Sequence, residues 1–213
     1  MHRLAQLGLA AALAAASGAA AMAQQAAPVA PATPAASAAP AAPAPSITAA
    51  APAAPAAPAM PAARPSDVAT IDAIIAALYA VISGPAGAPR DWDRMRSLFA
   101  PDGRMAAIGM RPDGSYPLRM MTPDDYIARN TKAFATMGFF ETELARRTET
   151  FGQIAHVLST YEARHAAGDA RPFMRGVNSI QLVHDGKRWY VLSVLWRGED
   201  AQLQLPERYL RNG

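Results

Sequence analysis

Two runs of alternating apolar residues, joined at Asp185-Gly186, constrain the fold of this chain more than any other feature. Residues 175–196 read RGVNSIQLVHDGKRWYVLSVLW and are rich in β-branched, aromatic and aliphatic side chains, which suit a pleated and partly buried surface. Asp-Gly between such runs is the strongest short-range hairpin signal, because both central residues of a type I′ turn need a positive φ. We therefore expect a hairpin here, at the centre of a curved sheet.

The N-terminus has the layout of a secretory signal peptide. A basic start at Arg3 is followed by an apolar run over residues 4–16 and an A-x-A site at 21–23. The run is shorter than the ~20 residues that a membrane-spanning helix needs, with an uncleaved anchor as the alternative. We expect residues 1–23 to be removed after Ala23, leaving a periplasmic or secreted protein without a membrane span.

Residues 24–65 consist almost entirely of Ala and Pro, with no charged side chain from Gln24 to Ala63. Recurring prolines remove backbone donors and prevent a continuous helix. Because large apolar groups are scarce, this segment cannot offset its ordering entropy, and we expect a disordered linker. The folded domain is then expected over residues 66–213.

Composition excludes several classes of function. The net charge of +3 is too small to indicate binding to nucleic acid or to acidic membranes. The chain has no Cys, which excludes disulfides, thiolate zinc sites and thiol nucleophiles. It contains no Gly-rich phosphate loop or G-x-S-x-G elbow, and we expect no cofactor.

The order of the expected elements favours an α+β domain. Apolar residues at helical spacing predict a first helix from Ser66 to Ile82, and Asp91 and Thr122 are expected to cap two further helices. Pro101-Asp102-Gly103 is expected to end the second helix and Gly138 the third. The expected strands are a weak pair over 104–110 and 115–121, then 140–149 and 151–165, and then the hairpin, followed by a short tail over 206–210.

The first helix, the run DWDRMRSLFAPDGR, the third helix, the run FGQIAHVLSTYEAR and the hairpin together resemble the nuclear transport factor 2-like superfamily, over about residues 67–210. Members include ketosteroid isomerase, scytalone dehydratase and polyketide cyclases. The resemblance implies a cystatin-like cone: three N-terminal helices packed in the concave side of a strongly curved, mainly antiparallel sheet, with a largely apolar pocket. It also implies a homodimer through the outer face of the sheet. The runs at 151–164 and 175–196 are similar to those of bacterial members without an assigned activity.

The resemblance also points to site residues. The catalytic Asp of ketosteroid isomerase corresponds to Ala107, which cannot accept a proton, so the isomerase mechanism is not supported. Its oxyanion donors fall near Tyr79 and Asn178, and a pocket aromatic falls on Trp196. With His156, a possible general base, these three are the expected ligand-binding residues. No catalytic residue is assigned, and the candidates are His156 and Tyr79.

Strand alternation predicts which other side chains share a face. Trp196 would share one face with Tyr190 and Val194, while Trp189 and Val191 would face the other way. Two apolar faces on one strand imply burial on both sides, which would favour a dimer.

The polar residues of the expected strands allow more than one interpretation. The charged residues of 141–149 are interpreted as a solvated face or edge, with Glu143 or Arg164 in the pocket as the alternative. A metal site is not expected, because His156 and His165 lie an odd number of residues apart on one strand.

Three hypotheses about function follow. The first is an exported domain that binds a small, largely apolar molecule in the cone. The second is a lyase or isomerase in which His156 acts with Tyr79 or Asn178. The third is a dimeric interaction module without a ligand.

Overall fold

The computed structural model describes residues 60–213 of the chain. The predicted signal peptide over residues 1–23 and the predicted linker up to residue 59 lie outside the described residues. The elements, in order, are α1 (Pro65–Val68), α2 (Ile71–Ile82), α3 (Trp92–Leu98), β1 (Phe99–Ile108), α4 (Pro123–Thr136), β2 (Phe140–Phe151), β3 (Ile154–Arg164), β4 (Met174–His184), β5 (Trp189–Gly198) and η1 (Glu207–Tyr209). Within residues 60–213, no helix combines the length and apolarity needed to cross a membrane.

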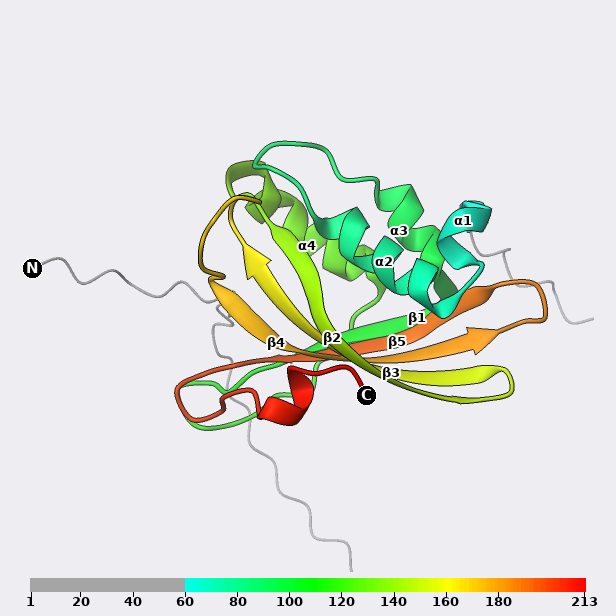
Figure 1. The fold of residues 1–213 in the computed structure, drawn as a ribbon. Helices are drawn as coiled ribbons and strands as arrows, with labels where there is room; N and C mark the ends of the chain where they lie inside the picture. The colour runs from blue at the N-terminus through cyan, green and yellow to red at the C-terminus, as the bar shows by residue number, and fades with distance from the viewer. Residues whose placement is uncertain (1–59) are drawn as a thin grey trace, which may run out of the picture. The chain divides into compact units, whose positions relative to one another are not determined.

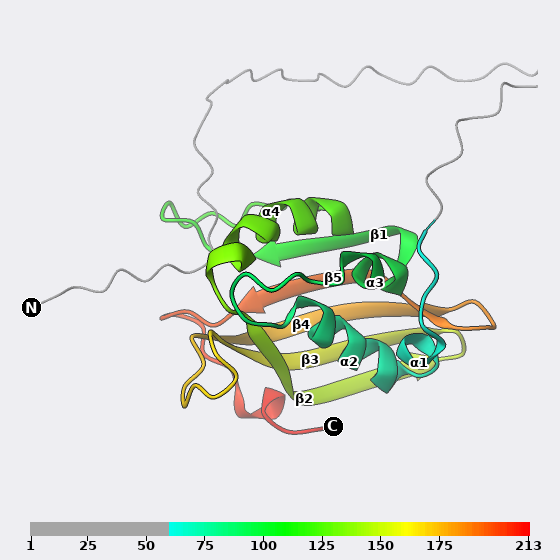
Figure 2. The ribbon, with the colours of Figure 1, turned by 90° about the horizontal axis from the view of Figure 1, so that it is seen from above.

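The five strands form one bent sheet in the order β1-β5-β4-β3-β2, and the helices lie on its concave side (Figure 1). Strands β2 to β5 pair in antiparallel fashion, whereas β1 pairs in parallel with β5. Seen from above, α4 lies beside β1, and α2 crosses the sheet nearer β2 (Figure 2). The predicted α+β class, with helices packed in a mainly antiparallel curved sheet, is confirmed.

Side-chain caps determine where the helices begin. Thr122 and Asp125 form a reciprocal capping box at the start of α4, as the sequence predicts, and Asp91 accepts from the Arg94 N–H at the start of α3. The single first helix expected from Ser66 is wrong. Thr70 adopts an extended conformation and caps a new helix by accepting from the Ala73 N–H, so α1 and α2 are separate.

Two other expectations about the early part of the domain need correction. The second helix ends at Leu98, and Pro101 and Gly103 lie within β1 instead of ending the helix. The register of β1 with β5 shifts between Phe99 and Arg104, and this irregularity accommodates the proline in an edge strand. The expected partner strand over 115–121 is reduced to a single bridge between Met105 and Met121.

The predicted hairpin of β4 and β5 is confirmed, but its turn differs from the expected type I′. Strand β4 ends at His184 and β5 begins at Trp189, which leaves a four-residue loop. Within it only Gly186 has a positive φ, of 94°. The Asp185 carboxylate accepts from the N–H groups of Lys187 and Arg188 and stabilises the loop, so Asp185 need not enter the left-handed region.

A register shift in β5 changes the predicted distribution of apolar side chains. Leu182 pairs with Val191, but Gln181 pairs with Ser193, so Leu192 is an extra residue in the ladder. Both Trp189 and Trp196 therefore contact the core between helices and sheet, together with Val191 and Val194. The prediction that the two tryptophans face opposite sides is therefore wrong. The argument that both faces of β5 are buried rested on that prediction and no longer holds.

The C-terminal segment lies against the face of the sheet opposite the helices (Figure 1). The Thr160 hydroxyl donates to the Tyr209 carbonyl oxygen at 2.5 Å. Strand β2 is an edge of the sheet, and there the Arg146 N–H donates to the Asn212 side-chain oxygen at 2.9 Å. The Gly213 N–H donates to the Arg146 carbonyl oxygen at 3.1 Å. The tail thus occupies both backbone groups of one residue at the sheet edge.

Gly176 provides a test of this packing. A Cβ atom there would lie 2.4 Å from the Arg197 carbonyl oxygen and 2.6 Å from the Tyr161 hydroxyl. We expect Gly176→Ala to lower the free energy of unfolding by about 1–3 kcal/mol, because the two strands and the Tyr161 ring must separate. Chemical denaturation measures this change. Gly168→Ala, at a position with open space around it, is the control, and an equal effect of both variants would contradict the packing.

Candidate functional site

The concave face of the sheet gathers polar side chains beneath α2 and α4. Register places Arg146 opposite Ser159, Ser159 opposite Asn178, and Asn178 opposite Trp196, so one row of inward-facing residues crosses four strands. Glu143 lies opposite Tyr161 in another row of the same face. This row lies within a largely apolar core. We refer to the group formed by Glu141, Tyr161, Asn178 and Trp196 of the sheet with Tyr79 of α2 and Tyr126 of α4 as the inner site.

Hydrogen bonds link three residues of α2, β3 and β4. The Tyr79 hydroxyl lies 2.6 Å from Ser159 Oγ, and Asn178 Nδ2 donates to the Tyr79 oxygen at 3.1 Å. The second hydrogen of the same amide nitrogen points to Glu141 Oε1 at 3.3 Å. Asn178 thus joins the helix side of the inner site to the carboxyl group of Glu141.

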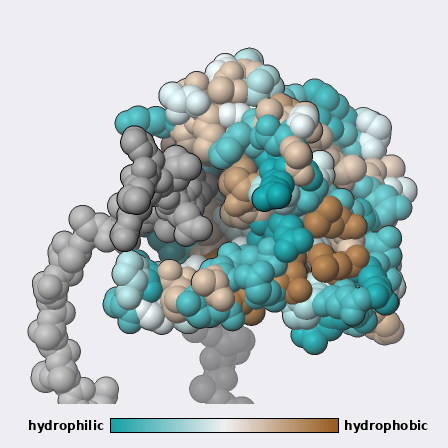
Figure 3. Space-filling view, turned by 60° about the vertical axis from the view of Figure 1, so that its left-hand side comes forward, coloured by the Kyte–Doolittle hydropathy of each residue, from teal (hydrophilic) through white to brown (hydrophobic). Residues whose placement is uncertain are grey.

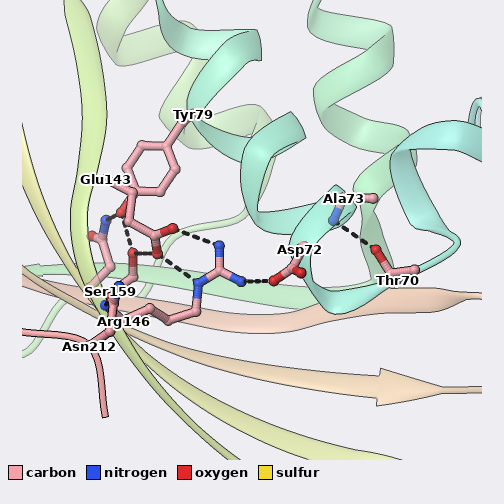
Figure 4. A network of polar contacts seen from close by, with 9 residues as sticks. Thr70, Asp72, Ala73, Tyr79, Glu143, Arg146, Ser159 and Asn212 are labelled. Carbon is pink, nitrogen blue, oxygen red and sulfur yellow. Dashed lines mark hydrogen bonds and ion pairs between the residues drawn. The ribbon is translucent and has the colours of Figure 1, made fainter.

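An ion-pair network continues this chain toward the surface (Figure 4). The Ser159 hydroxyl donates to Glu143 Oε1 at 2.5 Å, and Arg146 donates two hydrogen bonds to the same carboxylate, at 2.9 and 2.6 Å. Arg146 also pairs with Asp72 of α2. Glu143 and Arg146 are three residues apart, and regular alternation would place them on opposite faces. The register shift at Leu144 brings both onto the concave face.

Glu141 has an unusual environment for a carboxyl group. Desolvation by the surrounding side chains raises its pKa from 4.5 to about 7, against a smaller lowering effect of the Asn178 hydrogen bond. The residue nevertheless keeps some accessible surface. Near neutral pH the carboxyl group therefore exists in both protonation states.

Aromatic residues surround this carboxyl group. Burial raises the pKa of the Tyr79, Tyr126 and Tyr161 hydroxyls, and the nearby Glu141 raises all three further, so they stay neutral donors. Tyr161 is fully buried, and its hydroxyl oxygen has no hydrogen-bond partner among the described residues. Tyr126 contacts Trp196 edge to face, with 6.2 Å between ring centroids. The inner site thus offers an unpaired donor, a titratable acid and apolar walls.

The structure brings together three of the four predicted site residues. Tyr79 and Asn178 are in direct contact, and Trp196 is the neighbour of Asn178 on β5. His156 is not with them: it pairs with exposed Gln181 on the outer face, and its Nε2 lies 3.0 Å from Ser179 Oγ. The expected pairing of His156 with Tyr79 or Asn178 therefore does not occur.

The preferred interpretation of residues 141–149 as a solvated face or edge is correct in that β2 is an edge strand, but three of the charged side chains do not face solvent. Glu141, Glu143 and Arg146 face the helices, whereas Arg147 and Glu149 are exposed. The alternative that placed Glu143 inside is correct. Arg164 instead pairs with Glu162.

Sequence reasoning missed Glu141 and Tyr161 as members of the inner site, and Ser159 beside it. Glu141 and Glu143 share strand parity, as do Ser159 and Tyr161, and those spacings were the available signal. Alternation alone does not say which of the two faces of a strand meets the helices, and the bulge at Leu144 further obscured the pattern by turning Arg146 to the same face as Glu143.

Another concave region lies at the far end of the β4–β5 hairpin. A cleft with a volume of about 520 Å³ is lined by Met60, Phe99, Val183 and Tyr190, among others, and the Arg188 guanidinium stacks on the Tyr190 ring at 3.6 Å. Hydrophobic residues also gather in patches on the side of the molecule shown in Figure 3. Among residues 60–213 there is no cluster of three or more side chains suited to bind a metal.

No family model and no curated protein matches this chain. Several solved structures do match this chain. A Nostoc punctiforme protein of unknown function with a cystatin-like fold is 11% identical, with 62% of this chain and 90% of that chain covered and a TM-score of 0.48. An NTF2-like protein from Cytophaga hutchinsonii is 10% identical, with 59% and 89% covered and a TM-score of 0.41.

Other matched structures carry ketosteroid isomerase or scytalone dehydratase in their names. These descriptions name the fold group that the sequence resembles, and at such low identities they concern the fold alone.

The raised pKa of Glu141 has a consequence for stability. In the folded chain this carboxyl stays protonated up to about pH 7, while in the unfolded chain it ionises above about 4.5. Stability from this group is therefore full below pH 4.5 and is lost as the pH rises to 7, by up to about 3 kcal/mol.

We accordingly expect Glu141→Gln to remove this loss, so that the variant gains stability relative to the wild type between pH 5 and pH 8. Urea denaturation at several pH values measures the difference. Glu149→Gln, an exposed position on the same strand, serves as the matched control. A constant difference between Glu141→Gln and wild type across this range would show that Glu141 is not desolvated.

Proposed function

We propose that the inner site binds a small, largely apolar molecule that carries a carbonyl or similar hydrogen-bond acceptor. The observation that carries this proposal is the desolvated carboxyl group of Glu141, with a pKa of about 7, in a residue that keeps some accessible surface. A protonated carboxyl group in an apolar environment is a strong donor to a neutral acceptor. An anion would instead meet a site that already holds the Glu143 carboxylate and, above pH 7, a second one.

The remaining groups suit such a molecule. The unpartnered Tyr161 hydroxyl supplies a second donor in the same region, and a buried donor without a partner is costly until a ligand or water satisfies it. The rings of Tyr126 and Trp196 provide flat apolar surface. Tyr79 does not serve as a free donor, because its proton is directed to Ser159.

The same carboxyl group supports a second candidate function, proton transfer in a lyase or isomerase. General acids and bases work best when their pKa lies near the working pH, and Glu141 meets this condition. Glu141 would take the role of general base that was expected of His156, which faces away, and that Ala107 cannot fill. Proton transfer would run between Glu141 and a carbon next to the bound carbonyl group.

We also propose export of the chain, on the basis of its N-terminal sequence, and self-association through the outer face of the sheet. Leu192 and Ile154 are exposed there, on β5 and β3. Mass determination of the mature protein and its sedimentation behaviour test these two points. A mature N-terminus other than Gln24, or a monomer at all concentrations, would contradict them.

Binding can be tested with a panel of neutral cyclic ketones, followed by ligand-observed NMR at pH 6 and pH 8. If protonated Glu141 donates to the ketone, affinity should fall about tenfold between these two values, because the neutral fraction falls by that factor around a pKa of about 7. Glu141→Gln keeps a donor that does not titrate, so its affinity should be independent of pH. Trp196→Ala should weaken binding at both values.

Two results would contradict the binding proposal: no ketone binds at either pH, or the pH dependence persists in Glu141→Gln. Proton transfer has its own readout in the same samples. In D₂O, an enzyme of the proposed class should catalyse exchange of the hydrogens next to the ketone carbonyl, and Glu141→Gln should abolish that exchange. Binding without exchange would leave the site as a binding site only.

A further inference from the structure

The hydrogen bonds around Tyr79 have a direction that the heavy atoms alone determine. Ionised Glu143 can only accept, so the proton of the Ser159 hydroxyl is directed to it. Ser159 Oγ must then accept from the Tyr79 hydroxyl, at 2.6 Å. The Tyr79 oxygen in turn accepts from an N–H of Asn178, at 3.1 Å. Each hydrogen in this series of hydrogen bonds has one acceptor. Reversing any one of these bonds would leave a neighbouring group without a partner.

This direction determines how the Asn178 carboxamide is oriented. Rotated by 180°, the amide would present its oxygen to a tyrosine oxygen that has no remaining proton to donate. The observed orientation instead presents Nδ2, whose second hydrogen points to Glu141 Oε1 at 3.3 Å. We propose that Ser159, Tyr79 and Glu143 are positioning residues that act through Asn178 and keep its amide nitrogen aimed at Glu141.

Glu143, at the end of this series of hydrogen bonds, is held in place by an ion pair. Arg146 makes a two-pronged ion pair with Glu143 and reaches Asp72, and the C-terminal tail occupies its backbone N–H and C=O. Glu143 and Arg146 are both largely buried, so this pair is less screened than a surface pair. Arg146 thus keeps the Glu143 carboxylate in place as an acceptor. The direction of every hydrogen bond from Asn178 to Glu143 follows from that acceptor.

The inference builds on the proposed function, since it explains how the donor to Glu141 is held, but it can be tested without any ligand. The titratable groups that face Glu141 are Tyr79 from α2, Tyr126 from α4 and Tyr161 from β3, with Glu143 on its own strand. The three tyrosines stay neutral throughout the relevant pH range. A change in the titration of Glu141 therefore reports on Asn178 and on Glu143.

The experiment is a ¹³C NMR titration of the Glu141 carboxyl in the full-length chain, with the resonance assigned by its loss in Glu141→Gln. In Ser159→Ala, the Tyr79 proton loses its acceptor and turns to the Asn178 oxygen, so the amide rotates and its nitrogen leaves Glu141. Loss of that hydrogen bond should raise the pKa of Glu141 by about one pH unit. Tyr79→Phe should raise it in the same direction, and Ser159→Thr, which restores the hydroxyl, should return it to the wild-type value.

Ser179→Ala is the matched control, because Ser179 lies on the neighbouring strand with its hydroxyl on the outer face, against His156. It should leave the titration unchanged. The inference is overturned if Ser159→Ala and Tyr79→Phe leave the pKa of Glu141 unchanged or lower it, or if Ser159→Thr fails to restore it. Failure of ketone binding with the expected pKa shifts would remove the proposed function and leave the positioning role intact.

Discussion

The side chains that face the helices are determined by strand alternation together with two interruptions of it. The extra residue at Leu144 allows Glu143 and Arg146 to lie on the same face of β2, where they form an ion pair. The extra residue at Leu192 turns both Trp189 and Trp196 toward the core. Without these bulges, one member of each pair would point away from the helices. The inner site thus depends on backbone irregularity, in agreement with the frequent occurrence of bulges beside functional sites.

A desolvated carboxyl group costs stability at neutral pH, and among residues 60–213 only the Asn178 amide donates a hydrogen bond to the Glu141 carboxyl group. The Tyr161 hydroxyl lies in the same region and has no hydrogen-bond partner within this part of the chain. Two polar groups in one region that remain incompletely satisfied are unusual in a folded interior, where nearly all such groups are paired. Glu143 differs from Glu141 in this respect, because Arg146 and Ser159 both donate hydrogen bonds to its carboxylate.

The sequence predicted the four long strands at the end of the domain, the central hairpin and the capping of α3 and α4, because these depend on local signals such as Asp91, Thr122 and Asp185-Gly186. It also predicted that Tyr79, Asn178 and Trp196 lie together. It did not predict the break at Thr70, since a helical pattern of apolar residues continues across it. Nor did it place Glu141 inside or His156 outside. Both depend on which face of β2 and of β3 meets the helices, and alternation within a strand does not decide between its two faces.

The contacts of Asn212 and Gly213 with Arg146 have a consequence beyond the inner site. An edge strand with free N–H and C=O groups can recruit a strand from another molecule and so begin the growth of an intermolecular sheet. At Arg146 the chain's own last residues already occupy those groups. Uncontrolled association would have to start farther along β2, where the charge of Glu149 stands beside exposed Phe151. The tail thus leaves fewer free backbone groups at the edge of β2 with which a strand of another molecule could pair.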